Sequence, residues 1–269
     1  MLANPRSDRV RSVRGLSKRS VRERTGRFAV EGPQGVREAI RYAGSQVRDV
    51  YVTPEARRRY AEDIVGPAQT GGLRVHDVTP EVLAAMSETE APQGVLAVLE
   101  TAQPSLGDVL AGAPRLLVLL AHVRDPGNAG TVIRGADAAG ADAVLVSEAS
   151  VDVLSPKVVR STAGSLFHLP VVVGLAVGGT LERLRAHGIR TYAADGAGST
   201  LLPDADLDVP HCWVMGNEAW GLDDATRAAC DDVVRVPIHG RAESLNLAMA
   251  ATVCLYASAG HHAAGPDAG

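Results

Sequence analysis

The sequence predicts an α/β protein that consists of a small N-terminal domain and a larger domain built on a mostly parallel sheet. Short apolar runs alternate with segments of helical spacing along the chain. In the second half these runs are apolar almost throughout, as expected for parallel strands covered on both faces. Hydrophobic residues make up 46% of the 269 residues but aromatic residues only 3%, which predicts an aliphatic core.

The smaller domain is expected over residues 28–100, after a basic arm at residues 1–27. Alternating apolar positions predict strands at residues 27–32, 47–53, 73–78 and 94–99. Helical spacing predicts helices at residues 33–42 and 80–87. Residues 101–114 contain two prolines and two glycines and have no long apolar run, so we interpret them as a linker.

The larger domain is expected over residues 115–260, followed by a disordered tail at residues 261–269. Apolar runs predict strands at residues 115–123, 143–147, 169–173, 190–194, 212–215 and 233–238. Helical spacing predicts helices at residues 128–139, 156–166, 180–187, 223–230 and 244–258, the last capped by Glu243 and Ser244.

Composition argues against several classes of protein. The three cysteines are far apart and form no CxxC pair, which argues against a zinc site or a disulfide framework; we expect no metal. The longest apolar run, residues 116–123, is much shorter than the roughly 20 residues of a membrane span. No secretory signal is recognisable either, so a cytoplasmic protein that does not enter membranes is expected.

The net charge of -4 is unevenly distributed. Residues 1–30 hold nine basic and two acidic residues, whereas the remainder holds 18 basic and 29 acidic residues. Such asymmetry indicates contact with nucleic acid, although a solvated basic helix is the simpler explanation. The candidates for phosphate contact are Arg11, Arg14, Lys18, Arg19, Arg22 and Arg27.

Three strands of the larger domain run into glycine-containing turns that carry polar side chains, at residues 124–134, 214–222 and 236–246. Ends of parallel strands meet at one sheet edge, where open α/β folds bind ligands. The candidate catalytic residues are Asn128, Arg134, Glu218, Ser244 and Asn246. Taken singly, each has a simpler explanation: a helix cap, a surface carboxylate, or an ion pair of Arg134 with Asp137 or Asp142.

Common catalytic signatures are missing from these turns. The chain has neither the GxGxxG of dinucleotide sites nor the GxxxxGK[ST] of P-loops, and it lacks the GxSxG of hydrolases. His239 and Ser244 are five residues apart, a spacing that is common by chance. Residues 127–130 open a helix after a strand and could hold an anion through backbone N–H groups.

The three turns resemble the motifs of the SpoU/TrmH branch of the SPOUT methyltransferases. The matching segments are Asp125-Pro126-Gly127-Asn128 with Arg134, then Gly216-Asn217-Glu218-Ala219-Trp220-Gly221, then Val236-Pro237-Ile238 with Glu243-Ser244-Leu245-Asn246. One departure is Ala121-His122, where the family often has an aspartate after the first strand. The N-terminal part resembles a substrate-binding domain similar to ribosomal protein L-thirty-e, at residues 28–32 and 92–95.

The resemblance implies an enzyme that transfers methyl from S-adenosylmethionine to a ribose 2′-hydroxyl in RNA. It also implies a trefoil-knotted parallel-sheet domain, with the knot at about residues 190–259, and a homodimer formed through the C-terminal domain. Cofactor contacts would come from Ala194, Gly216, Val236, Ile238 and Leu245. Arg134 would hold the target phosphate and stabilise the alkoxide, Asn128 would assist with substrate, and Glu218, Ser244 and Asn246 would orient Arg134 and the ribose.

The sequence does not identify the RNA target. A separate N-terminal domain favours ribosomal RNA over transfer RNA. The sequence is also compatible with a base methyltransferase of the wider knotted superfamily and with a non-catalytic RNA-binding scaffold.

Overall fold

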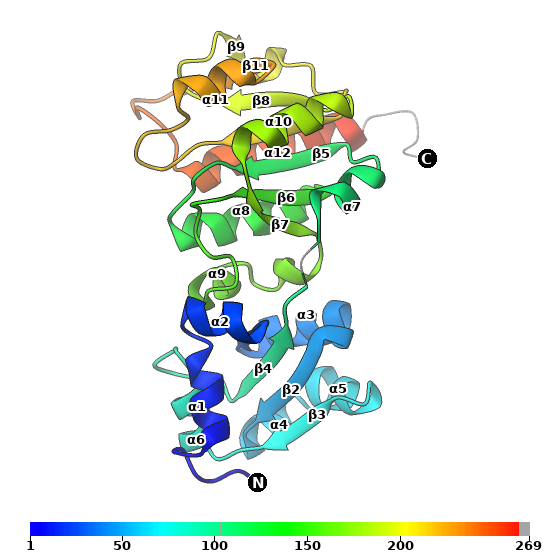
Figure 1. The fold of residues 1–269 in the computed structure, drawn as a ribbon, viewed down its shortest axis with the longest axis vertical. Helices are drawn as coiled ribbons and strands as arrows, with labels where there is room; N and C mark the ends of the chain where they lie inside the picture. Colours follow the sequence, from blue (N-terminus) through cyan, green and yellow to red (C-terminus); the bar gives the residue numbers. More distant parts are fainter. Residues whose placement is uncertain (103, 264–269) are drawn as a thin grey trace. The chain divides into compact units, whose positions relative to one another are not determined.

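The computed structural model describes residues 1–102 and 104–263, which form two compact units (Figure 1). The first unit comprises residues 1–102 and 152–168, and the second comprises the other described residues. The chain therefore leaves the first unit after residue 102, returns to it at residue 152 and leaves it again after residue 168.

The first unit is built on a mixed sheet with the strand order β1-β4-β2-β3, in which β4 runs antiparallel to both of its neighbours. Its strands are β1 (Arg27–Glu31), β2 (Val47–Val52), β3 (Arg74–Asp77) and β4 (Val95–Glu100). Its helices are α1 (Asp8–Gly15), α2 (Arg19–Thr25), α3 (Pro33–Ala43), α4 (Pro54–Arg59), α5 (Gly66–Thr70), α6 (Pro80–Met86) and α9 (Pro156–Ser161). The four strands, α3 and α6 agree with the predicted ranges to within one residue. The short helices α4 and α5 were not predicted, because neither is long enough to show helical periodicity.

The predicted basic arm forms part of the first unit, because α1 packs against α6. Val10, Val13 and Leu16 are buried in a cluster with Val82 and Leu83 of α6. Their three-residue spacing places them on one face of the helical turns, which leaves the intervening arginines exposed. The arm therefore contributes an apolar stripe to the core as well as positive charge to the surface.

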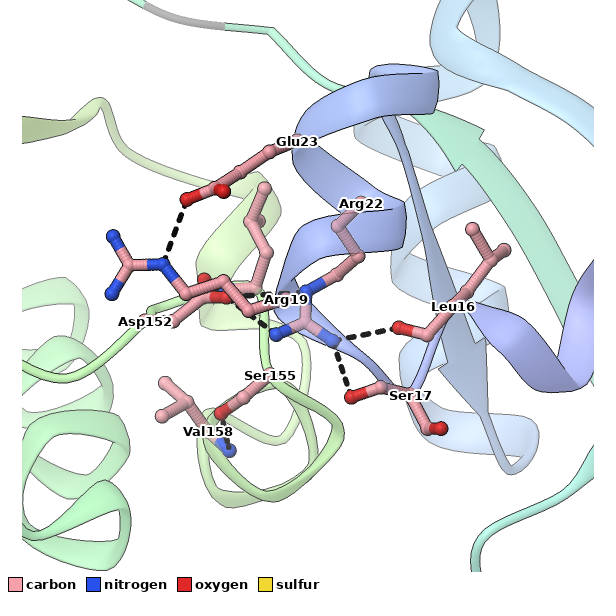
Figure 2. Close-up of polar contacts among 9 residues, drawn as sticks. Leu16, Ser17, Arg19, Arg22, Glu23, Asp152, Ser155 and Val158 are labelled. Carbon is pink, nitrogen blue, oxygen red and sulfur yellow. Dashed lines mark hydrogen bonds and ion pairs between the residues drawn. The ribbon is translucent and has the colours of Figure 1, made fainter.

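Arg22, in α2, has a buried side chain that is 5% exposed. Figure 2 shows its polar contacts with Leu16, Ser17 and Asp152. Its Nη1 donates hydrogen bonds to the carbonyl oxygens of Leu16 and Ser17, both at 2.7 Å. Its Nε donates to the Asp152 carboxylate at 3.2 Å, and Nη2 forms an ion pair with the same carboxylate. Because these groups are all used within the unit, the prediction that Arg22 contacts RNA is corrected: it holds residue 152 against α2.

Residues 152–168 complete the core of the first unit. Val159 belongs to the buried cluster of the small sheet, and Phe167 packs against that cluster. The helix predicted at residues 156–166 in the larger domain is instead α9 followed by a 3-10 turn, Ser165–Phe167. Gly164 separates the two with a φ of +105°, and a Cβ there would lie 2.5 Å from Cγ of Glu38.

The second unit is built on a seven-stranded parallel sheet with the strand order β7-β6-β5-β10-β8-β11-β9. Its strands are β5 (Leu116–Leu120), β6 (Ala143–Ser147), β7 (Val171–Leu175), β8 (Arg190–Ala194), β9 (Thr200–Leu201), β10 (His211–Met215) and β11 (Asp232–Arg235). Its helices are α7 (Leu106–Ala111), α8 (Pro126–Ala138), α10 (Val177–Ala186), α11 (Asp224–Ala229) and α12 (Leu247–Ala263). The six predicted strands are present, and the two-residue strand β9 is additional. Helix α7 lies inside the predicted linker, where Ser105 and Asp108 form a capping box.

Helices cover both faces of this sheet, as the apolar strands predicted. Helices α8 and α12 lie on one face, and α7, α10 and α11 lie on the other (Figure 1). Helix α12 continues through His261 and His262, which were predicted to be disordered, whereas residues 264–269 lie outside the described part of the chain. Among the described helices, none combines the length and the apolar character needed to cross a membrane.

A buried polar cluster joins β10 to α12. His211 Nε2 lies 2.7 Å from Oγ of Ser258, and Trp213 Nε1 donates to the same hydroxyl at 2.9 Å. His211 Nδ1 lies 2.8 Å from the carbonyl oxygen of Val209. Burial lowers the pKa of His211 to about 4, and the contact with the Val209 carbonyl opposes this shift only in part.

Replacing Arg22 should destabilise the first unit strongly. We expect Arg22→Ala to lower the free energy of unfolding by about 3 kcal/mol, because Asp152 and two carbonyl groups lose a buried partner. Urea denaturation monitored by circular dichroism measures this loss of free energy. Arg19→Ala is the matched control on the same helix, since the Arg19–Glu23 pair is exposed and should contribute less than about 0.5 kcal/mol. Equal losses in the two variants would contradict the structural role of Arg22.

Acid should destabilise the protein through His211. A folded-state pKa of about 4 against an ordinary value of 6.5 means that the unfolded chain binds the proton more readily. The free energy of unfolding should therefore fall between pH 6.5 and pH 4, by up to about 3 kcal/mol from this residue. Urea titrations across this range should show a shallower loss in His211→Gln than in the parent. His187→Gln, at an exposed position, should retain the parental pH dependence.

Candidate active site

Four neighbouring strands of the second unit end side by side. Leu120 of β5 lies opposite Met215 of β10, and Ala194 of β8 lies opposite both Met215 and Val234 of β11. The turns that follow these strands therefore share one edge of the sheet, the edge at which open α/β folds bind ligands. The structure thus brings the three predicted polar turns together.

Asn217 fixes the turn that follows β10. Its side chain is nearly buried, donates from Nδ2 to the carbonyl oxygen of His122 at 2.7 Å and accepts from the N–H of Ala219 at 2.8 Å. Its backbone exchanges two hydrogen bonds with Gly221, both of 2.9 Å. A Cβ on Gly216 would lie 2.3 Å from the carbonyl carbon of Gly221, so the closed turn requires glycine there. His122 has a φ of +57°, which is uncommon for a non-glycine residue, and the Asn217 amide holds this strained turn in place.

Glu218 joins this turn to the start of α8. Its carboxylate accepts the backbone N–H groups of Arg124 at 3.2 Å and Asp125 at 3.0 Å. It also accepts Nδ2 of Asn128 at 3.2 Å. Asp125 in turn caps α8 by accepting the N–H of Asn128 at 2.7 Å. Free N–H groups at a helix N-terminus favour such a carboxylate, so Glu218 acts here as a clamp between two turns.

Asn128 and Asn246 extend this clamp to the third turn. Oδ1 of Asn128 accepts Nδ2 of Asn246 at 3.0 Å. Oδ1 of Asn246 accepts the N–H of Ala248 at 2.9 Å, at the start of α12, so Asn246 takes the capping place predicted for Glu243 and Ser244. Because an ionised carboxylate can only accept, each amide in this Glu218–Asn128–Asn246 network has a fixed orientation.

Arg134 and Ser244, the other two predicted catalytic residues, lie outside the network. Both are exposed, and neither side chain has a hydrogen bond or an ion pair to another described residue. No ion pair joins Arg134 to Asp142 in the described part of the chain. Oδ2 of Asp142 accepts the backbone N–H groups of Arg115 and Leu116 at 2.7 and 2.9 Å. The guanidinium of Arg134 is thus open to an external anion.

The predicted cofactor-binding residues surround the same sheet edge. Gly216 is buried, and Ile238 is 38% exposed. The other three are half-buried: Ala194, Val236 and Leu245. The turn after Ala194 is held by Asp195, which accepts the N–H of Ala197 at 2.9 Å and Nη1 of Arg227 at 3.0 Å. Partly exposed apolar side chains beside backbone polar groups are typical of a site for a flat ring.

The first unit carries the positive charge of the protein. It holds 18 Lys and Arg residues against 14 Asp and Glu residues, a formal charge of +4, which leaves -8 on the rest of the chain. Of the residues predicted to contact RNA, Arg11, Arg14, Lys18 and Arg19 are exposed and Arg27 is half-buried. Arg11 pairs with Asp8, Arg19 with Glu23, and Arg14 donates to the carbonyl of Ala85 at 3.3 Å.

The burial of the cysteines disfavours reactive thiolates. Cys212 and Cys254 are buried, and burial raises the pKa of Cys254 to about 12 and that of the half-buried Cys230 to about 11. Within residues 1–102 and 104–263, no three His, Cys, Asp or Glu side chains are grouped in a way that could hold a metal ion.

Sequence reasoning did not single out Asn217, although it directly precedes Glu218. An asparagine between a glycine and a carboxylate at the end of a buried strand was the available signal. It was insufficient because the partner of Asn217, the carbonyl of His122, is 95 residues away in the chain.

Removing the Asn217 amide should loosen the turn after β10. We expect Asn217→Asp to lower the free energy of unfolding by about 2 kcal/mol, because the new carboxylate cannot donate to the carbonyl of His122. Urea denaturation at neutral pH provides the measurement. Asn4→Asp, at an exposed position, serves as the control and should be close to neutral. An unchanged stability of Asn217→Asp would show that this hydrogen bond does not hold the turn.

Family models match both parts of the chain. Residues 115–256 match the SpoU rRNA Methylase family, and residues 7–97 match the MRM3-like substrate binding domain. A relative from Bacillus subtilis, the 23S rRNA (guanosine(2553)-2'-O)-methyltransferase RlmP, is 32% identical over 95% of this chain and 97% of its own length.

Solved structures of similar fold cover nearly the whole chain. The AdoMet-bound rRNA methyltransferase from Sinorhizobium meliloti has a TM-score of 0.84 and 29% identity, covering 97% of both chains. The SpoU methyltransferase AviRb from Streptomyces viridochromogenes, in complex with AdoMet, has a TM-score of 0.84 and 31% identity, covering 96% of this chain and all of its own. With the family match over residues 115–256 and the three motif turns joined at one sheet edge, the chain belongs to the SpoU rRNA methylase family.

Proposed function

We propose that this protein transfers the methyl group of S-adenosylmethionine to a ribose 2′-hydroxyl of ribosomal RNA. The observation that carries the proposal is the Glu218–Asn128–Asn246 network, which joins the three family motifs at the ligand-binding edge of the sheet. The relatives support the choice of RNA, because those from B. subtilis and S. meliloti are named rRNA methyltransferases. A cytoplasmic location belongs to the same proposal.

The residues at the sheet edge fit S-adenosylmethionine. Val236, Ile238 and Leu245 offer apolar side chains that are not fully buried, beside the turn formed at Gly216. A Cβ on Gly198 would lie 2.5 Å from the carbonyl oxygen of Val233, so backbone segments approach closely in this region. The bound cofactor would supply an electrophilic methyl group on a sulfonium centre. The chain's own residues must then position the ribose and stabilise its 2′-oxygen while the hydroxyl proton passes to solvent water, and the cofactor would leave as the neutral thioether.

Arg134 is the residue best suited to the acceptor side of the reaction. Its guanidinium is exposed and has no side-chain partner among the described residues. Arginine stays protonated in proteins, so it serves poorly as a base. It can hold a phosphate bidentately and stabilise negative charge that develops on the hydroxyl oxygen. Ser244, also exposed, would help to orient the ribose.

Asn128, Glu218 and Asn246 act mainly by positioning. Glu218 is occupied by two backbone N–H groups and Asn128, so it orients the turn before α8. Through Asn128 and Asn246 the same network fixes the start of α12. Glu218 does not orient Arg134 directly, because its hydrogen bonds go to Arg124, Asp125 and Asn128.

The first unit would bind the RNA and the second would carry out the reaction. The formal charge of +4 on the first unit favours phosphate contacts, which give affinity with little sequence information. Lys18 and Arg24 are exposed and have no side-chain partner among the described residues, so they are the best-placed cations of α2 and its cap.

We further propose that the second unit is knotted and forms a homodimer. Membership of the SpoU family supports the knot, and the structure places the C-terminal helix α12 against α8 and β10. Met249, Val253 and Tyr256 leave a row of large exposed hydrophobic side chains along α12, with exposed fractions of 42% to 60%. A second copy of the chain would cover this row.

Methyl transfer tests the function directly. Labelled S-adenosylmethionine is incubated with the protein and with total RNA from cells that lack this gene. The RNA is then separated by size into ribosomal and transfer RNA and hydrolysed in alkali. Label in an alkali-resistant dinucleotide is expected, because 2′-O-methylation blocks the strand-cleaving attack. Label in mononucleotides would indicate base methylation, and label only in the transfer RNA fraction would contradict the choice of RNA.

Arg134→Lys distinguishes the proposed role of Arg134 from a simple charge effect. Lysine keeps the charge but lacks the planar fork, so we expect kcat to fall at least about 10-fold with little change in affinity for S-adenosylmethionine. The same labelled assay and equilibrium dialysis of the cofactor measure the two quantities. Arg183→Lys, on the exposed face of α10, is the control and should keep the parental kcat. Full turnover in Arg134→Lys would exclude the bidentate role.

A further inference from the structure

Trp220 is an exposed tryptophan in a protein that has few aromatic residues. The chain has two tryptophans: Trp213 is fully buried in β10, whereas Trp220 is 56% exposed. The guanidinium carbon of Arg124 lies 5.3 Å from the centroid of the Trp220 ring, a distance typical of a cation–π contact. An aromatic ring and a cation therefore stand together at the surface, and we call them the Arg124–Trp220 pair.

The backbone beneath this pair is firmly held. The N–H of Arg124 donates to Glu218 at 3.2 Å, and Trp220 follows Glu218 by two residues in the same turn. The two hydrogen bonds between Asn217 and Gly221 close that turn around Trp220. The backbone of both residues is therefore held near Glu218, the carboxylate that also joins the motif turns. The side chains of Arg124 and Trp220 are exposed to solvent.

We propose that the Arg124–Trp220 pair stacks on a nucleobase of the RNA beside the methylated ribose and so determines which nucleotide is presented. The inference rests on the proposed function and deepens it, since it assigns a base-recognition element to the same site. Base–aromatic stacking needs an open ring face, and the exposure of Trp220 supplies one. The Arg124 guanidinium adds cation–π stacking and can contact the adjoining phosphate.

The charges around the pair favour a nucleotide as its occupant. The Glu218 carboxylate accepts hydrogen bonds from two backbone N–H groups and one side-chain amide. These donors offset part of its negative charge and so reduce its repulsion of an approaching phosphate. Arg124 forms no ion pair with a carboxylate of the described residues, so its positive charge is available to an approaching phosphate. An indole face beside an uncompensated cation matches a base and its phosphate.

The kinetic test compares Trp220→Ala, Trp220→Phe and the parent with the ribosomal RNA fragment that receives the methyl label. We expect Trp220→Ala to raise the KM for RNA about 10-fold or more with a smaller effect on kcat, and Trp220→Phe to restore most of the loss. Arg124→Ala should raise the same KM by a smaller factor, whereas Arg183→Ala, the exposed control on α10, should leave it unchanged. Mapping the labelled nucleotide should show reduced selectivity in Trp220→Ala.

A binding test that needs no turnover uses intrinsic fluorescence. Because Trp213 is fully buried, quenching by the RNA fragment should report on Trp220 and should disappear in Trp220→Phe. S-adenosylmethionine alone should leave the fluorescence unchanged. Quenching by the cofactor alone would overturn the proposal by placing Trp220 in the cofactor site. A lower mass of Trp220→Ala in sedimentation would also overturn it, by placing Trp220 at a subunit contact.

The two proposals can fail separately. If the parent protein transfers no methyl group to ribosomal RNA, the proposed function fails whatever Trp220 does. If the parent transfers methyl and Trp220→Ala has the parental KM and selectivity, the function stands and the base-recognition role fails.

Discussion

The hydrogen-bonded network of Glu218, Asn128 and Asn246 is the interaction on which the site depends. It joins side chains that are 90 and 118 residues apart in the chain, and it links the turns after β5 and β10 to the start of α12. Since Glu218 also binds the backbone N–H groups before α8, one carboxylate fixes both a helix start and a strand-to-turn junction. Polar side chains in the candidate active site thereby hold the backbone in the geometry that a cofactor and a ribose would need.

The two units are interleaved along the chain. Residues 152–168 leave the second unit, contribute Val159 to the core of the first and are held by Arg22 through Asp152. A truncation at about residue 100 would therefore remove the partners of this segment and expose its apolar side chains. A separated catalytic unit would need residues 152–168 replaced by a short connection, because these residues belong to the core of the other unit.

The distribution of charge agrees with a division of labour between the units. The first unit has a formal charge of +4, and the remainder of the chain has -8. Phosphate contacts through the first unit would give affinity for RNA, whereas the acidic second unit would rely on a few placed groups such as Arg134 and the Arg124–Trp220 pair. Specificity would then come from the geometry of the motif turns more than from overall attraction.

The sequence by itself determined the class of fold, every strand of both sheets except the two-residue β9, and the three polar turns, because burial on a strand or helix leaves a local periodic pattern. The tertiary structure decided the rest. It converted Arg22 from a predicted RNA contact into a buried ion-pair residue, moved residues 156–166 into the first unit and gave Asn217 its partner His122. A local sequence pattern indicates which face of a helix or strand is buried, but it does not indicate which residues pack against that face. Hydrogen-bond partners far apart in the chain are fixed only when the sheet aligns its strands.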